Sequence, residues 1–368
     1  MLRASDCRAS STDVIEFEIS TTSGVIALVN LQAQIDGLQR QATAGGLPAV
    51  SDRAELIELV ALRGQVLGRI DDYEWAEERA EQLTCDAPED AAAFLARARA
   101  RGRFHRFTDS LADLDEARRL GADPVIVDAE RAGVFQAVGR YESALTIYLE
   151  AAKRRADFAS LGALATLHAD RGEIAAAEQL FDESRDRYRG VSPFPLALLD
   201  FQRGHMWMTH GDLNRARSWF VEACRLLPCF APASGHLAEV EAALGETDLA
   251  VDRLRQLADR SDDPDYAAAL ARILREIGRA EEAATWRAAA EARYEELVST
   301  HCEAFADHAA SFLLETGGDP FRALSLAQRN LEVRQTARAI NLHERAARAC
   351  EQVGGSTVTA GGAVRLRL

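Results

Sequence analysis

A period of about 34 residues runs through most of this 368-residue chain. Three segments show it directly: GRIDDYEWAEERAEQL (68–83), AVGRYESALTIYLEAA (137–152) and THGDLNRARSWFVEAC (209–224). Each contains a turn, then an aromatic or aliphatic residue, then a small residue three positions later, followed by apolar residues at helical spacing. Self-similarity at this period predicts a stack of helix pairs, because a single pair cannot bury its apolar face alone.

Two columns of small residues fix the register of the repeat. The first column consists of Ala76, Ser110, Ala144, Ala177, Ala216, Ala250, Ala283 and Ala323. The second lies twelve residues upstream and consists of Gly64, Ala98, Ala132, Ala165, Gly204, Ala238, Ala271 and Ser311. Two antiparallel helices that cross closely need a small residue from each helix, so these columns predict the crossing points.

A third column marks the turn between the two helices of each unit. It lies five residues before the first column and consists of Asp71, His105, Gly139, Gly172, Gly211, Gly245, Gly278 and Gly318. Glycine suits the end of a helix because it adopts the left-handed conformation without strain. Two intervals exceed the period: one accommodates the loop GVSPFP (190–195), and the other indicates a longer second helix over 281–300.

These columns resemble the tetratricopeptide repeat (TPR) family, whose units carry small residues at the crossing and glycine near the turn. The resemblance implies an all-α fold, a right-handed α-solenoid of about eight TPR-like helix-turn-helix repeats with a C-terminal capping helix. The bias toward Ala and toward Arg over Lys indicates a GC-rich, bacterial genome.

The remaining segments lie at the two ends of the array. We expect residues 1–24 to be disordered or to precede the native start, and 25–52 to form a capping helix and linker. The array itself covers 53–337. Residues 338–352 have the pattern of an amphipathic capping helix, and the Gly-rich residues 353–368 that of a flexible tail.

The sequence carries no motif for a nucleotide, a serine nucleophile or a zinc protease. Its six cysteines form no CxxC pair, so we expect no metal, no cofactor and no enzymatic activity. The competing hypothesis is a cryptic enzyme or metal protein that uses His205, His210, Cys224 and Cys229.

Charge and hydropathy limit the expected partners. A formal net charge of −15 argues against nucleic acid, which needs a basic stripe. No run of 18 apolar residues occurs, so we expect no membrane insertion. The N-terminus lacks a secretory pattern, which favours a cytoplasmic location. Oligomers remain possible.

The family pattern places the first helix of each unit on the concave side of the solenoid. Its groove positions give these candidates for binding a partner: Arg99, Phe201, His205, Met208, Glu239, Arg272, His308 and Phe312. The leading hypothesis is a non-catalytic scaffold or adaptor that holds a protein or peptide in this groove. The alternative is an assembly factor for an envelope or secretion complex that acts through self-association.

Overall fold

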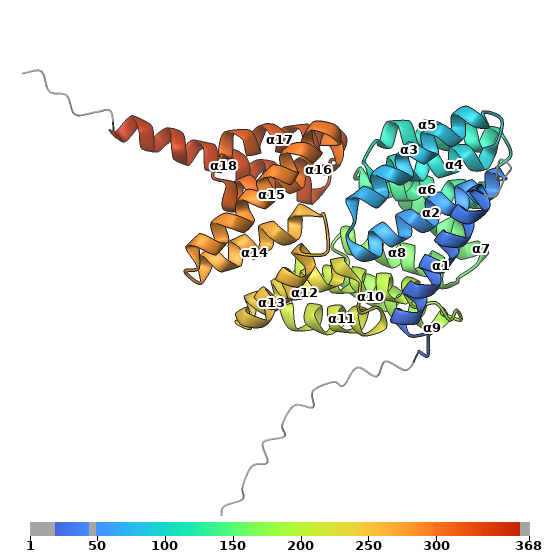
Figure 1. Cartoon of the computed structure of the whole chain (residues 1–368), viewed down its shortest axis with the longest axis horizontal. Helices are drawn as coiled ribbons and strands as arrows, with labels where there is room; N and C mark the ends of the chain where they lie inside the picture. The colour runs from blue at the N-terminus through green and yellow to red at the C-terminus, as the bar shows by residue number, and fades with distance from the viewer. Residues whose placement is uncertain (1–18, 44–48, 361–368) are drawn as a thin grey trace, which may run out of the picture.

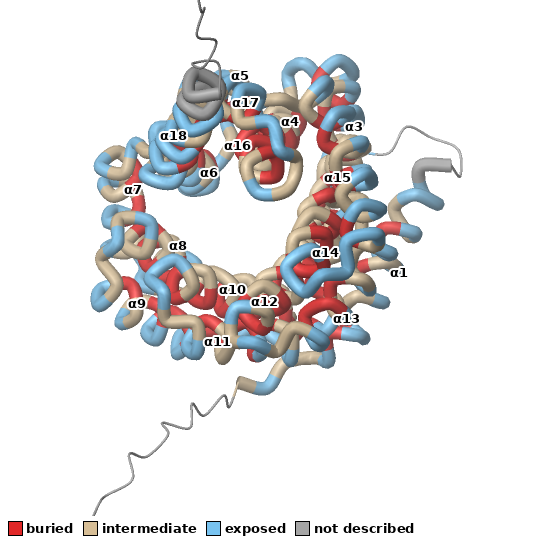
Figure 2. Tube along the Cα trace, turned by 90° about the vertical axis from the view of Figure 1, so that its left-hand side faces the viewer, coloured by how far each residue is buried: buried red, intermediate tan, exposed pale blue. Residues whose placement is uncertain are grey.

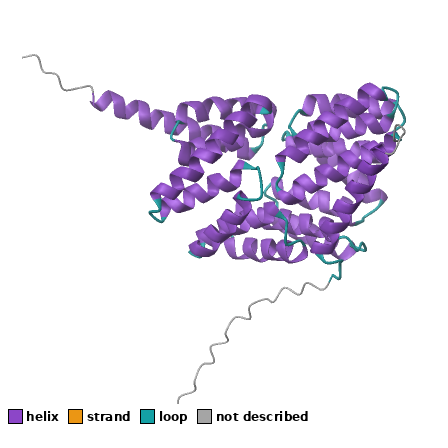
Figure 3. Cartoon of the chain, viewed as in Figure 1, coloured by secondary structure: helices purple, strands orange, loops and turns teal. Residues whose placement is uncertain are grey.

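The computed structural model describes residues 19–43 and 49–360, and within these ranges helices joined by short loops make up the chain, with no strand (Figure 3). A short π-helix, η1 (Leu313–Gly317), ends one of the helices. The α-helices are α1 (Gly24–Thr43), α2 (Val50–Leu67), α3 (Ile70–Asp86), α4 (Ala91–Arg103), α5 (Phe107–Arg119), α6 (Pro124–Ala137), α7 (Tyr141–Arg154), α8 (Phe158–Asp170), α9 (Ile174–Arg187), α10 (Pro193–His210), α11 (Leu213–Leu226), α12 (Ala231–Ala243), α13 (Thr247–Ala258), α14 (Pro264–Glu276), α15 (Ala280–Thr300), α16 (Cys302–Phe312), α17 (Pro320–Val333) and α18 (Ala337–Ala360).

Helices α2 to α17 form eight antiparallel pairs, and the small-residue columns lie where the two helices of a pair cross. Every member of the first column is buried. Ser110 replaces Ala there and donates a hydrogen bond of 2.8 Å to the carbonyl oxygen of Ala98, its partner in the second column. At Gly204 a Cβ atom would lie 2.7 Å from the Phe220 ring. The predicted all-α repeat fold and its register are therefore confirmed.

The turn column adopts the left-handed conformation in seven units, His105 included, with φ values between 57° and 89°. The first unit differs from the prediction. There Gly68 takes the left-handed conformation, and α3 begins at Ile70, one turn early, so Asp71 lies inside the helix. The reason is tertiary: the Asp262 carboxylate, from a distant unit, accepts hydrogen bonds from the amides of Ile70 and Asp71 at 2.7 and 2.9 Å.

One of the two spacings that exceed the 34-residue period results from a longer second helix, as predicted. Helix α15 is 21 residues long, whereas the second helices of units two to six contain 12 to 14. The Pro-bearing segment contributes less loop than predicted. Pro193 is the first residue of α10, because proline's fixed φ suits the first helical position.

The pairs wind about a central axis and bring the two ends of the array together (Figure 1). Viewed along the axis, α8, α10 and α12 lie inside, and α9, α11 and α13 lie outside (Figure 2). We call the surface formed by the first helices of the pairs the inner face. The Gln335 amide, just before α18, donates a hydrogen bond of 3.2 Å to the Val138 carbonyl oxygen in the α6–α7 turn. The array therefore winds back on itself, so that the segment before α18 touches the third unit.

One additional helix flanks the array at each end. Leu31 and Ile35 of α1 pack with Val60 of α2. Helix α18 continues to Ala360, eight residues beyond the predicted end at 352, because extending a formed helix is far easier than nucleating one. Residues 1–18 and 361–368 of the predicted terminal segments lie outside the described residues. Within the described part, no helix is both long and apolar enough to cross a bilayer.

Candidate functional site on the inner face

The eight predicted groove residues all lie on first helices, but the structure brings only some of them together. Phe201 and His205 of α10 meet His236 of α12, with ring centroids 5.6 and 5.7 Å apart, respectively. Phe201 also packs against the rings of Phe220 and Phe230. We call Phe201, His205 and His236 the aromatic patch.

Burial sets the protonation of His205. It lowers the pKa of His205 to about 4, and the neighbouring charges of His236 and Arg338 act in the same direction. The imidazole is therefore neutral at physiological pH. A neutral ring flanked by aromatic side chains can stack on a planar group or exchange a hydrogen bond with it.

A chain of polar contacts continues from the aromatic patch along the inner face. His236 Nδ1 lies 2.9 Å from a Glu239 carboxylate oxygen, and Glu239 lies 3.8 Å from the Arg272 guanidinium. Arg272 also approaches Glu276 and Glu315 at 3.5 and 3.7 Å. Burial raises the pKa of Glu239, but the bond from His236 and the charges of His236 and Arg272 lower it overall. Glu239 and Arg272 thus neutralise one another in the free protein.

His308 occupies the next position around the ring and is paired with a carboxylate. Its Nδ1 lies 2.7 Å from Asp265 of α14, which also accepts a hydrogen bond from the Tyr294 hydroxyl. The charge of Asp265 raises the pKa of His308 to about 9, against the opposing effect of burial. His308 is therefore a cation at neutral pH, balanced by Asp265.

Three predicted candidates lie outside this group. Arg99 binds Glu130 at 2.6 Å and lies 3.6 Å from Glu58, so it joins α2, α4 and α6 away from the aromatic patch. Met208 packs against the apolar cluster around Trp207 and Phe220. Phe312 is 5% exposed, and its ring lies on Tyr294. The Phe312 side chain therefore serves the core and offers no free face to a partner.

Three residues of this region are not predicted from the sequence: His236, Asp265 and Arg338. His236 falls outside the groove positions of the family pattern, and Asp265 follows an acidic run that is typical of a solvated turn. Arg338 falls on the polar face of the predicted capping helix. In the structure its charge lowers the pKa of His205 and reaches His308, although its guanidinium forms no ion pair with any described carboxylate. Only the winding of the array brings the Arg338 charge within electrostatic reach of His205, Asp265 and Asp307.

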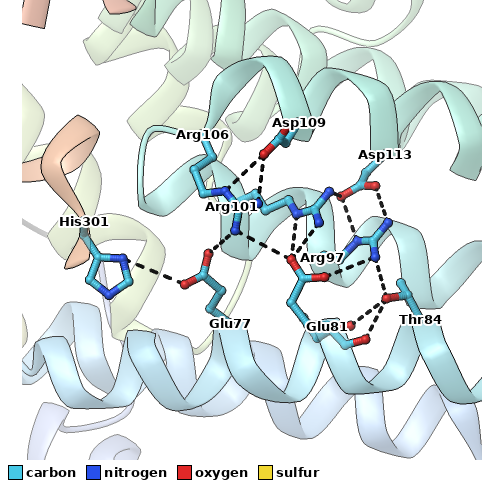
Figure 4. A network of polar contacts seen from close by, with 10 residues as sticks. Glu77, Glu81, Thr84, Arg97, Arg101, Arg106, Asp109, Asp113 and His301 are labelled. Atoms are coloured by element: carbon cyan, nitrogen blue, oxygen red, sulfur yellow. Dashed lines mark hydrogen bonds and ion pairs between the residues drawn. The ribbon is translucent and has the colours of Figure 1, made fainter. Parts of the chain in front are cut away.

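A second polar cluster joins the helices of the first two units (Figure 4). Arg97 and Arg101 both bind Asp113 and Glu81, and Arg106 binds Glu77 and Asp109. An open cleft of about 530 Å³ follows the carboxylates of α3 beside this cluster. Because its principal charges are mutually paired, we interpret the cluster as a brace that joins α3, α4 and α5.

The proposed cysteine and histidine chemistry gains no support from the geometry. Burial raises the pKa of Cys224 to about 11 and also raises the pKa of Cys229. Both thiols are therefore protonated at neutral pH, and the thiolate is the reactive and metal-binding form. Within the described residues, no three His, Cys, Asp or Glu side chains gather as metal ligands would.

Comparison with known proteins identifies the fold rather than a close relative. The sequence matches no protein-family model, and no curated protein matches it. Among solved structures, the human IFIT1 dimer with PPP-AAAA aligns over 88% of this chain and 78% of IFIT1, with 17% identity and a TM-score of 0.54. The IFIT1 dimer with m7Gppp-AAAA aligns over 88% and 77%, with 16% identity and the same TM-score.

A tetratricopeptide repeat protein from Parabacteroides merdae ATCC 43184 aligns over 64% of this chain and 93% of its own, with 16% identity and a TM-score of 0.41. The eight helix pairs, with small residues where the two helices of each pair cross, identify the fold. This chain has the fold of a TPR-like helical solenoid.

One prediction about partners is wrong. The net charge of −15 argues against nucleic acid, yet IFIT1, a solenoid of similar fold, has been solved with triphosphate and capped RNA. The prediction fails because binding depends on the electrostatic potential at the binding site and not on the net charge of the whole chain. The net charge therefore does not distinguish a protein partner from a nucleic-acid partner.

Proposed function

We propose that this protein is a non-catalytic scaffold whose inner face holds an extended segment of a partner protein. The aromatic patch and Arg338 carry the proposal. Phe201, His205 and His236 offer planar surfaces, and Arg338 supplies a cationic group that forms no ion pair with a described carboxylate. Phenylalanine and arginine are both enriched at protein interfaces, and arginine is among the residues that most often dominate their binding energy.

The charges of the inner face favour a peptide of mixed character. Arg272 and His308 are balanced by Glu239 and Asp265, so the free protein presents alternating acidic and basic groups around the ring. A segment with one acidic side chain for Arg338 and an aromatic or aliphatic side chain for the patch would match this order.

A peptide-display screen tests the proposal, because it selects ligands from a random library and requires no identified partner. Peptides selected on the purified protein are measured by calorimetry against His205→Ala, Arg338→Gln and the outer-face control Lys153→Gln, whose side chain is 69% exposed. We expect each inner-face change to weaken binding about tenfold, which is about 1.4 kcal/mol, and the control to have no effect. Selected peptides that bind all variants equally would refute an inner-face site.

Single-stranded RNA is the second candidate, favoured by the IFIT1 structures with PPP-AAAA and m7Gppp-AAAA. A base could stack on the aromatic patch while a phosphate pairs with Arg338. Fluorescence anisotropy with a 5′-triphosphate oligonucleotide and its 5′-hydroxyl counterpart separates the candidates. Binding that depends on the triphosphate, falls with salt and is lost in Arg338→Gln would favour RNA over peptide.

A further inference from the structure

The long helix α15 does more than connect two units. A second helix of the usual 14 residues would end near Arg293, but α15 continues to Thr300. At 1.5 Å per residue the additional seven residues add about 10 Å of length. We call residues 294–300, with Arg293 before them and His301 after them, the α15 extension; it reaches the first two units, about 200 residues or more away in the chain.

The extension contacts α3 and α4 through side chains at both of its ends. Arg293 lies 3.1 Å from Asp71 and 3.9 Å from Glu74, both of α3, and it also lies 3.2 Å from Asp262 in the α13–α14 loop. The His301 ring stacks on Phe104 with centroids 3.9 Å apart, and its Nε2 lies 3.3 Å from Glu74. Figure 4 shows His301 directed at the carboxylate of Glu77, which its Nδ1 approaches at 3.9 Å.

Further contacts belong to this seam: the Ser261 hydroxyl donates a hydrogen bond to the Gly68 carbonyl oxygen, and the Gln335 amide bonds the Val138 carbonyl oxygen. Asp262 caps the first amides of α3, as described above, and so stabilises a helical turn that the repeat pattern does not predict. His105 Nδ1 lies 3.1 Å from the Glu303 carbonyl oxygen. His105 stands in the turn column with a φ of 57°, where the other units have Gly or, in the first, Asp71. His105 therefore stands where Gly would fit the turn without strain, and its side chain contacts the other side of the seam.

The contacts of the N-terminal units with the rest of the ring differ in kind. On one side Val66 of α2 is buried in an apolar cluster with Leu196, Leu227 and Phe230 of the middle units. At the seam, most contacts are polar and partly exposed, apart from the stack of His301 on Phe104 and the buried Tyr266 ring, which lies against Gly68. Within the described residues, no apolar cluster joins α14–α18 to α3–α7.

We propose that the α15 extension is a releasable latch that holds the last units of the array against the first and controls access to the inner face. The apolar packing of α2 on α10–α12 keeps the hinge side closed, while partly exposed ion pairs at the seam hold the other side weakly. Release swings α14–α18 away from α3–α4 and from the α6–α7 turn, and widens the path to the aromatic patch. The control of access rests on the proposed function; the latch itself does not.

Distance measurement between two spin labels tests the latch without any ligand. The labels are attached to unnatural amino acids at Glu78 and Ser299, which are exposed on either side of the seam. We expect one short distance in the parent protein and an added longer population in the double variant Arg293→Gln/His301→Ala. Raising the salt concentration from about 0.05 to about 1 M should enlarge that population, since salt screens exposed ion pairs.

The matched control is Arg287→Gln, which removes an ion pair of α15 with Glu291 away from the seam. It should leave the short distance unchanged. Circular dichroism establishes that each variant keeps its helix content, and Asp262→Ala provides a second, independent way to break the seam. An unchanged single distance in both folded seam variants would overturn the latch.

The second arm measures the association rate of a selected peptide or of the triphosphate oligonucleotide. If the latch controls access, the double variant should bind at least threefold faster than the parent protein. Equal rates in a variant that opens would overturn the control of access. If no ligand is found at all, the proposed function fails, whereas the distance measurement still decides on the latch.

Discussion

Ala144 shows how one side chain fixes the geometry of a unit. It is fully buried where α7 crosses α6, opposite the equally buried Ala132. A larger side chain would force the two helix axes apart, and the displacement would pass to the neighbouring units because each packs on the next.

Ala144→Arg is therefore expected to destabilise the protein by at least about 1–3 kcal/mol, because it adds bulk and an unpaired charge to a closed crossing. Urea unfolding followed by circular dichroism measures the change. Thr146→Arg, at an exposed position of the same helix, serves as the control and should change stability by less than about 0.5 kcal/mol. Equal stability of the two variants would mean that the register is incorrect.

The pair of His308 with Asp265 makes stability depend on pH. The folded-state pKa of His308, about 9, lies above its ordinary value of 6.5. The pair therefore stabilises the fold fully below pH 6.5 and loses its contribution as the pH rises through about 9.

We expect the parent protein to lose about 1 kcal/mol relative to His308→Gln between pH 6.5 and 9.5. This figure is reduced from the full shift because a third of the His308 side chain is exposed. Urea midpoints at the two pH values provide the measurement, with the exposed His210→Gln as control. A difference that does not vary with pH would show that the pair is not formed in solution.

At the level of elements, buried charges join α9, α10 and α11. The Arg185 guanidinium bonds Asp200 and lies 3.0 Å from Glu222, while Arg225 binds Glu222 from the solvent side. Asp200 and Glu222 are 1% and 2% exposed. Burial raises the pKa of Asp200 to about 6, even though the charge of Arg185 opposes the rise.

Arg185→Met is expected to cost about 3–5 kcal/mol, because it leaves buried carboxylates without their main partner. The control Arg217→Met breaks a pair with Glu246 whose side chains are 38% and 39% exposed, and it should cost less than about 1 kcal/mol. Thermal or urea unfolding compares the two. Similar losses would indicate that the α9–α11 network is open to water.

At the scale of the whole molecule, stability should vary around the ring. The middle units α10–α12 pack on their sequence neighbours and also on α1 and α2, as the shared cluster around Val66 and Leu227 shows. Helix α18 has a packing partner on one side of the array only. Regions with fewer buried contacts open more readily.

Hydrogen–deuterium exchange is therefore expected to be slowest in α10–α12 and fastest in the last turns of α18. Peptides from α6 and α7 should show intermediate protection and provide an internal reference. Equal protection of the middle and terminal units would contradict a ring anchored on the α2 side.

Sequence alone determined the helix pairs, their crossing points, most turns and the long helix α15. These features depend on short-range spacing, since a small residue at a crossing or a glycine at a turn is needed wherever it stands along the chain. Sequence also predicted that Phe201 and His205 share one face of their helix, and in the structure both rings contact His236.

The tertiary structure alone decided which units meet. The early start of α3 depends on a carboxylate from Asp262, His105 is explained by Glu303, and Arg338 reaches the aromatic patch because the array returns on itself. The winding of the array is the sum of small rotations between successive units. No local sequence pattern predicts this sum. The repeat pattern thus determines the helix pairs, whereas the superhelical winding brings together the distant residues of the candidate site and of the seam.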